Sequence, residues 1–375
     1  MSVAFGEAKK IIHTLKDHGY EAYIVGGAVR DLLLKMNASD IDIVTTASAS
    51  EVQRIFPKTF QMNNQHETVI VRVHHENFEV TTVRGDTVED DLYLRDLTIN
   101  SLAWDKEGRL IDPTGGLADL REGRLRTISP NDRMTEDPLR MLRVYRFVSE
   151  LGFTVDPELK AAVIQNHRML RAVAVERVVK EWMKLVKGKH RNLAIHGIME
   201  ANMLESIPGL TLTVNVLKKL SEMPTLETES ELVCWTVFCL CQDYTDETPL
   251  KQLALSNELL RGIKLRLRYF TMRLREPWKP YALYVATYEV ASDVETLRAL
   301  FHLPATTHKE LKEAWNELPI KKKDDLAITG RDLLYKKPGP WVKEELTWAE
   351  KAVVTKVIEN DKEQLLQAIE RRRTR

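Results

Sequence analysis

The stretch Tyr-Ile-Val-Gly-Gly-Ala-Val-Arg-Asp at residues 23–31, followed by Ser-Asp-Ile-Asp at 39–42, decides the fold of this chain. The apolar run at its start predicts a strand, the two glycines a tight turn, and the residues from Ala28 onward a helix. Asp40 and Asp42 fall on a second predicted strand. Because strand side chains alternate, these two carboxylates are expected to point to the same side of a sheet.

Two adjacent carboxylates suit Mg²⁺, which is usually held by one or two carboxylates together with substrate phosphates. Gly26 and Gly27 would let backbone N–H groups approach a phosphate near a helix start, and Arg30 adds positive charge. Each part alone is ordinary, since a Gly-Gly pair is usually just a turn and an Asp-x-Asp pair on a strand is usually solvated. Together they predict a site for metal-assisted transfer of a nucleotide.

This combination resembles the signature of the nucleotidyltransferase superfamily that includes DNA polymerase β. The form seen here is that of tRNA nucleotidyltransferases and bacterial poly(A) polymerases. The resemblance covers essentially the whole chain and implies two Mg²⁺ ions at Asp40 and Asp42, one activating the RNA 3′-hydroxyl and one neutralising the leaving pyrophosphate.

Length and composition bound the class of protein. The chain has 375 residues, which predicts two to four domains, and equal numbers of basic and acidic residues, 55 of each. An RNA partner would therefore be bound by local patches. Cys234, Cys239 and Cys241 lie in one apolar segment and are interpreted as buried small hydrophobes. With no signal region and no membrane-length apolar stretch, we expect a cytoplasmic protein with no membrane partner.

The first third of the chain predicts an α+β fold, in which a sheet carries helices on one side. A helix is expected over 2–19 and another over 49–56. Strands are expected at 59–62, 68–74 and 78–83. Glu79 lies on the last of these strands and is a possible third metal ligand, although a solvent-facing glutamate is an equally good interpretation.

A second motif, Leu-Arg-Asp-Leu-Thr-Ile-Asn, occupies residues 94–100. It resembles the family's Arg-Arg-Asp-x-Thr-x-Asn motif, with Leu94 in place of the first arginine. The resemblance makes Arg95 the candidate contact to the triphosphate.

A third motif, Thr-Glu-Asp-Pro-Leu-Arg-Met-Leu-Arg at 135–143, predicts a helix with Thr135 as its N-cap. Asp137 and Arg140 could form an ordinary i,i+3 ion pair. They could also read cytosine, because a carboxylate accepts from its amino group and a guanidinium donates to its acceptors. They match the family's amino-acid template, and Arg143 and Arg146 are predicted to face the triphosphate or the RNA end.

The remainder of the chain predicts an all-α neck, body and tail. The expected domains are a catalytic head at 1–133, a neck at 134–194 that carries the nucleotide-recognition helix, a body at 195–295, and a tRNA-binding tail at 296–375. Seven basic residues between Arg261 and Lys279 could form a surface for RNA phosphates or a merely solvated face.

Only ten residues, 85–94, separate Arg84 from Arg95. Full CCA-adding relatives carry a longer flexible loop here, thought to move the template helix between its cytidine and adenosine settings. The short segment therefore predicts a CC-adding tRNA nucleotidyltransferase that uses CTP and leaves the final adenosine to a separate A-adding enzyme. The alternatives are a full CCA-adding enzyme that also uses ATP, a poly(A) polymerase, and an inactive tRNA-binding protein.

Overall fold

The computed structural model describes residues 3–37, 41–61, 67–74, 76–333 and 339–373. The chain divides into two compact units, residues 1–221 and 222–375. The finer division into four domains stays a prediction.

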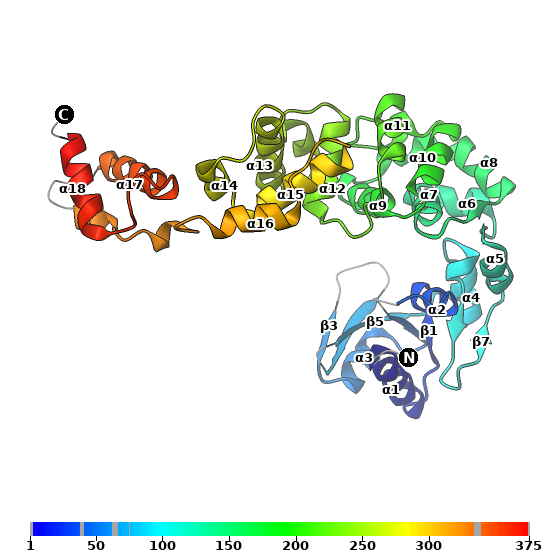
Figure 1. Ribbon diagram of the computed structural model, residues 1–375. Coiled ribbons are helices and arrows are strands. Elements are labelled where there is room, and N and C mark those ends of the chain that lie inside the picture. Colours follow the sequence, from blue (N-terminus) through cyan, green and yellow to red (C-terminus); the bar gives the residue numbers. More distant parts are fainter. Residues whose placement is uncertain (1–2, 38–40, 62–66, 75, 334–338, 374–375) are drawn as a thin grey trace. The chain divides into compact units, whose positions relative to one another are not determined.

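The N-terminal part of the first unit mixes strands and helices (Figure 1). Its strands are β1 (Ala22–Val25), β2 (Asp42–Thr45), β3 (Thr59–Gln61), β4 (Thr68–Val73), β5 (Glu76–Thr82), β6 (Ala103–Trp104) and β7 (Leu110–Ile111). Its helices are α1 (Val3–Asp17), α2 (Gly27–Leu33), α3 (Ala49–Ile55), α4 (Val88–Tyr93), the short 3₁₀ helix η1 (Thr98–Asn100) and α5 (Gly116–Glu122). The predicted α+β head is confirmed.

The seven strands form one mixed sheet in the order β3-β4-β5-β2-β1-β6-β7. Strands β2 and β5 run parallel, and the other neighbouring pairs run antiparallel. The register places Asp42 opposite Val25 on one side and Glu79 on the other. Since directly paired residues lie on the same face of a sheet, this row fixes which side chains share a face with Asp42.

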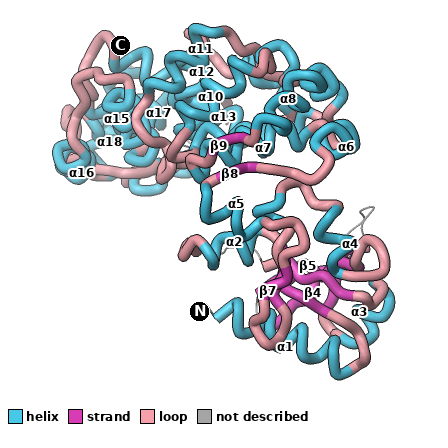
Figure 2. Tube along the Cα trace, turned by 90° about the vertical axis from the view of Figure 1, so that its right-hand side faces the viewer, coloured by secondary structure: helices cyan, strands magenta, loops and turns pink. Residues whose placement is uncertain are grey.

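One face of the sheet is closed by α1 and α3. Ile24, Ile43 and Val80 point into a core that also takes in Ile11 and Val52 from these helices. Helix α3 begins at a capping box in which Ser48 and Glu51 satisfy each other's backbone N–H groups. Figure 2 shows the sheet with both helices beside it.

The opposite face carries a smaller apolar cluster. Val25 and Val44 pack there against Val88 and Leu92 of α4. This helix therefore covers the part of the face around β1 and β2. Sequence reasoning placed no helix in this ten-residue segment.

The rest of the first unit is helical apart from a two-stranded pairing of β8 (Arg124–Leu125) with β9 (Thr154–Val155). Its helices are α6 (Pro130–Glu136), α7 (Leu139–Leu151), α8 (Pro157–Asn166), η2 (His167–Ala172), α9 (Val175–Lys187), α10 (Arg191–Glu200), η3 (Leu204–Ser206) and α11 (Val214–Glu222). The prediction that Thr135 caps a helix is wrong. Thr135 lies inside α6, and Asp137 separates that helix from α7.

The second unit, as far as it is described, is helical. It contains α12 (Glu231–Cys241), η4 (Thr248–Leu253), α13 (Asn257–Arg273), α14 (Pro280–Ala286), α15 (Tyr288–Leu300), α16 (His308–Asn316), η5 (Lys323–Asp325), η6 (Gly330–Leu333), α17 (Pro340–Val354) and α18 (Lys362–Arg373). The three cysteines on α12 are buried, as expected. Burial raises the pKa of the Cys239 thiol to about 12.

Candidate active site

The Gly-Gly turn brings an arginine close to the carboxylate of Asp42. Gly26 follows β1 and precedes α2 with a backbone φ of 72°, in the region that favours glycine. A Cβ atom at Gly26 would lie 2.8 Å from Nη1 of Arg95 and 3.8 Å from Oδ2 of Asp42. The N–H of Gly26 donates to the carbonyl of Leu102 at 3.1 Å. In this structure Gly26 therefore contributes the space in which Arg95 approaches Asp42. A role of the Gly27 N–H toward phosphate stays a prediction.

Arg95 is held in this space by a buried carboxylate. Its Nε donates to Oδ2 of Asp91 at 3.0 Å, and Nε of Arg84 donates to Oδ1 at 2.7 Å. Burial of Asp91 opposes ionisation, but the charges of Arg95 and Arg84 outweigh it and hold the pKa of the carboxyl below its usual value. Asp91 lies on α4 four residues before Arg95, a helical spacing that a reading of the sequence could have found.

Arg30 is buried beside the same segment. Its Nη1 donates to Oδ1 of Asn100 at 2.6 Å and its Nε donates to Asp31 at 2.8 Å. The guanidinium also lies over the ring of Phe147, 4.9 Å from the centroid. Arg30 thus ties α2 to η1 and to α7.

Leu94 and Asp96, on either side of Arg95, form hydrogen bonds to α6 and α7, the helices at whose junction Asp137 and Arg140 lie. Asp96 accepts from Nε and Nη2 of Arg143 on α7 at 2.9 and 2.6 Å, and from Nδ2 of Asn100 at 2.9 Å. The carbonyl of Leu94 accepts from Nη1 of Arg133 on α6 at 3.3 Å. Asp96 is largely buried, with 11 % of its side chain exposed, which opposes ionisation, yet Arg143 and Asn100 set its pKa well below the ordinary value.

Arg143 and Arg146 are both paired with carboxylates. Nη1 of Arg143 lies 3.3 Å from Glu181 on α9, and Nε of Arg146 lies 2.5 Å from the other oxygen of that carboxylate. Arg146 also pairs with Glu150 at 2.9 Å and is only 7 % exposed. In this structure both arginines bind carboxylates, and their predicted contact with a triphosphate or RNA end stays a prediction. They join α7 to the head and to α9, a role that sequence reasoning missed along with Asp96 and Glu181.

Asp137 and Arg140 do not form the i,i+3 ion pair that the sequence allowed. Oδ2 of Asp137 accepts from Nη2 of Arg177 at 2.7 Å, and Nη1 of Arg140 donates to Oε2 of Glu136 at 3.2 Å. Both side chains are half-buried at the junction of α6 and α7. Each side chain is therefore oriented by a different neighbour.

Glu79 shares the face of Asp42, because the two residues are register partners in the parallel pair of strands β2 and β5. Its side chain is exposed. Asp40, the other predicted ligand, lies outside the described residues. Within the described part of the chain, no group of three or more His, Cys, Asp or Glu residues could hold a metal ion. Oxygen donors on the face of Asp42 nevertheless fit Mg²⁺, which takes few protein ligands and completes its shell from phosphates and water.

The basic segment of the second unit is partly structural. Arg266 is buried and bound to Asp293 at 2.5 Å, and Arg273 is buried and bound to Glu295 at 2.7 Å. These two arginines cannot contribute to a phosphate-binding surface, which corrects the interpretation of the seven basic residues as one cluster. In the described segments, no helix is both long enough and apolar enough to cross a membrane.

Family models match three successive parts of the chain. Residues 22–126 match the poly(A) polymerase head domain. Residues 152–212 match the probable RNA- and SrmB-binding site of polymerase A, and residues 226–369 match a putative second domain of tRNA nucleotidyltransferases.

Relatives of full length agree with these matches. The CC-adding tRNA nucleotidyltransferase of Halalkalibacterium halodurans is 41 % identical over 369 residues, covering 97 % of this chain and 96 % of the relative. The CCA-adding enzyme of Geobacillus stearothermophilus is 37 % identical, covering 100 % and 99 %. The crystal structure of the Bacillus stearothermophilus CCA-adding enzyme with CTP superposes with a TM-score of 0.89 at 37 % identity, covering 100 % of this chain and 99 % of that one.

These relatives, which match this chain over its full length, are all tRNA nucleotidyltransferases that add CC or CCA. The chain belongs to the class II tRNA nucleotidyltransferases of the polymerase β superfamily and is a nucleotidyltransferase.

Proposed function

We propose that this enzyme adds cytidines to the 3′ end of tRNA from CTP, stops after two, and releases pyrophosphate at each step. The product would then be completed by a separate A-adding enzyme. The CC-adding relatives support this proposal, as does the CTP complex of the similar CCA-adding enzyme.

The observation that carries the restriction to CTP is the conformation of residues 85–94. Thr87 and Asp90 form a capping box at the start of α4. The buried carboxylate of Asp91 on the same helix accepts hydrogen bonds from Arg84 and Arg95. A short segment held at both ends by hydrogen bonds has little conformational freedom. It contains no long flexible loop whose movement could reposition Asp137 and Arg140 for adenine.

The chemistry follows from positioning and charge. Asp42 and Asp40, with Glu79 on the same face, would hold Mg²⁺, which would activate the RNA 3′-hydroxyl and offset the charge of the leaving pyrophosphate. Arg95 and Arg30 supply positive charge for the triphosphate. No covalent protein intermediate is needed, because the 3′-hydroxyl oxygen attacks the α-phosphorus directly and pyrophosphate leaves with the bonding electron pair.

In this proposal, residues at the junction of α6 and α7 select cytosine over the other bases. Asp137 accepts a hydrogen bond from the cytosine amino group, and Arg140 donates to the cytosine acceptors. Arg177 and Glu136 hold these two side chains before the nucleotide arrives. Preorganised groups of this kind spend less free energy on ordering when the base binds.

The second candidate function is that of a full CCA-adding enzyme. It is favoured by the likeness of this chain to CCA-adding relatives over its whole length. The alignment with the Geobacillus stearothermophilus relative, however, spans 402 positions, whereas this chain has 375 residues. The alignment therefore contains gaps where the relative has residues that this chain lacks.

The test is an extension assay on a tRNA transcript that ends before the CCA sequence. With CTP and ATP together, we expect products longer by two nucleotides and no third. A third nucleotide that requires ATP would establish the CCA-adding alternative. Long adenosine tails on generic RNA would establish a poly(A) polymerase, and no extension of any RNA would leave only an RNA-binding role.

A further inference from the structure

One row of residues crosses the sheet from its edge strand to Asp42. Phe60 on β3 is paired with Ile70 on β4, Ile70 with Glu79 on β5, and Glu79 with Asp42 on β2. Paired residues share a face, so Phe60 lies on the same face as Asp42. At about 4.8 Å per strand, three strand spacings separate the two residues by roughly 14 Å.

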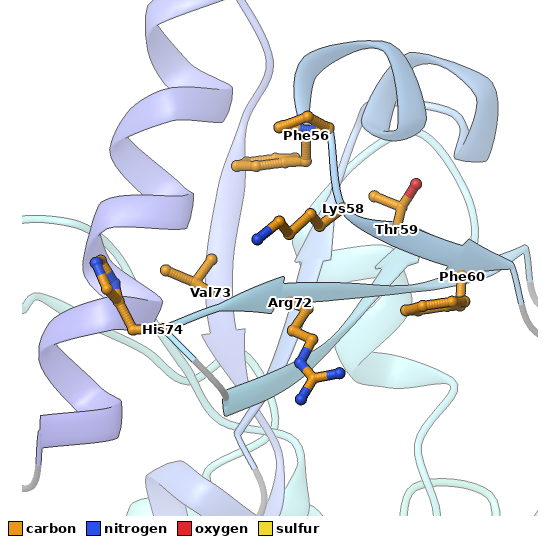
Figure 3. A pocket seen from close by; sticks show the side chains of 8 residues that line it. Phe56, Lys58, Thr59, Phe60, Arg72, Val73 and His74 are labelled. Atoms are coloured by element: carbon orange, nitrogen blue, oxygen red, sulfur yellow. The ribbon is translucent and has the colours of Figure 1, made fainter.

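The outer half of this face is open. Phe60 is 62 % exposed, and Arg72, its diagonal neighbour on β4, is also exposed. Figure 3 shows the side chains of Phe60 and Arg72 on one side of the hairpin and those of Phe56 and Val73 on the other. The open side is the face of Asp42, since Val71 and Val69, which alternate with Arg72 and Ile70, belong to the core beneath α1 and α3.

Phe60 offers an exposed aromatic ring on an edge strand. The pairing of an aromatic ring with a guanidinium group is how proteins bind single-stranded RNA, because bases stack on the ring while the cation meets the phosphates. The same row leads directly to the carboxylate at which the RNA 3′ end would react. Continuity with that site and the positive charge of Arg72 therefore point to RNA as the occupant.

We propose that Phe60 and Arg72 form an outer RNA site on the catalytic face of the sheet. Phe60 stacks on an unpaired base just upstream of the reacting 3′ end, and Arg72 pairs with a backbone phosphate beside it. This inference rests on the proposed function, because it requires an RNA 3′ end at Asp42. It assigns binding of the RNA primer, and not of CTP, to these two residues.

The test compares Phe60→Ala, Phe60→Trp and Arg72→Ala with the wild-type enzyme. The matched control is Lys58→Ala, which removes one exposed positive charge from the same edge of the sheet. The probe is a tRNA transcript lacking CCA in which one of the last unpaired bases is 2-aminopurine, whose fluorescence is quenched by stacking.

For Phe60→Ala we expect a Kd for the RNA raised about ten-fold, as for the loss of one base–aromatic stack, and a KM for CTP that does not change. The wild-type quenching of 2-aminopurine should disappear in Phe60→Ala and persist in Phe60→Trp. Arg72→Ala should lower the slope of log Kd against log salt concentration by about 0.7, the value for one phosphate contact on a single strand. Lys58→Ala should leave that slope unchanged.

Unchanged RNA affinity and unchanged quenching in Phe60→Ala would overturn the inference. So would a wild-type dimer that dissociates in Phe60→Ala while the Kd for RNA stays constant, because Phe60 would then serve contact between two copies of the chain. Failure of the proposed function is distinguishable, since in that case the wild-type enzyme itself would not extend the transcript with CTP.

Discussion

The two faces of the head sheet use the same strands for opposite purposes. On one face, Ile43 and its neighbours pack beneath α1 and α3 into a closed apolar core. On the other, Asp42 and Glu79 are paired neighbours, Arg95 lies against Gly26, and α4 packs only on the part around β1 and β2. Adjacent positions on β2 thus serve stability and chemistry, and a shift of one residue in register would exchange them.

This difference makes a sharp prediction for neighbouring residues on β2. Asp42→Asn should lower the rate of CTP incorporation by roughly 10³-fold, because one of the expected metal ligands is lost, with little change in the free energy of unfolding. Ile43→Ala should do the reverse. It should cost about 2–5 kcal/mol of stability and leave the rate of the folded enzyme nearly unchanged. Single-turnover kinetics and urea unfolding of both variants measure the two effects, and equal losses of rate would break the distinction between the faces.

The link between the open face and α7 predicts a dependence of stability on pH. The pKa of Asp96 is lowered in the folded state, so the folded protein gains stability from this carboxylate above the unfolded pKa of about 4 and loses it as the pH falls toward the folded pKa. Asp96→Asn should cost about 3 kcal/mol at pH 7, because Arg143 loses its two short bonds to the Asp96 carboxylate and keeps only the 3.3 Å contact with Glu181.

The difference in unfolding free energy between the wild type and Asp96→Asn should narrow below pH 4. Denaturant titrations at pH 7, 4 and 3 provide the check. A difference that stays constant across this range would show that the ion pair with Arg143 does not lower the pKa of Asp96.

Arg95 and Arg84 share the carboxylate of Asp91, but of these two it is Arg95 that lies against Gly26, 2.8 Å from where a Cβ atom would stand. Arg95→Met should therefore raise the KM for CTP by about 10- to 100-fold, the usual range for losing a charge-assisted hydrogen bond. Arg84→Met removes the other ion pair of Asp91 and should change that KM by less than about three-fold. Similar effects of the two changes would mean that Asp91 matters only for folding.

The smallest effect is expected at the base-reading junction. Asp137→Ala removes the acceptor for the cytosine amino group and should lower the preference for CTP over UTP by about ten-fold, with unchanged affinity for tRNA. Arg177→Ala, which removes only the partner of Asp137, should lower that preference less. Competition between the two nucleotides in one reaction measures the ratio directly, and an unaltered ratio in Asp137→Ala would place base recognition elsewhere.

The sequence predicted those parts of the fold that depend on local periodicity. The strands around Val25 and Ile43 and the first helix carry apolar residues at regular spacing, so their positions were predictable within one or two residues. The break between α6 and α7 was not, because Thr135 and the acids after it satisfy the rules for a helix start equally well. Asp137 has extended backbone directly before Pro138, the conformation that proline favours in the residue before it, and Arg177 binds its side chain across 40 positions of the chain.

In the candidate site, too, the features that local sequence patterns indicate were predicted. Gly26, Asp42 and Arg95 were found from motifs, and the structure brings them together. The partners of Arg143 and Arg146 were not found, because Asp96 and Glu181 come from distant segments and no local pattern joins them. An arginine in a basic stripe can be a ligand or an ion-pair partner, and only the tertiary structure distinguishes the two.

The central claim is that the open face at Asp42 is where a divalent cation meets the triphosphate. The most direct measurement is a crystal structure with CTP and Mn²⁺, recorded at an X-ray energy at which manganese scatters anomalously. We predict an anomalous peak at about 2.1 Å from a carboxylate oxygen of Asp42, with the triphosphate extending toward Arg95. A triphosphate bound away from Asp42, or a manganese peak on the α1 and α3 side of the sheet, would contradict it.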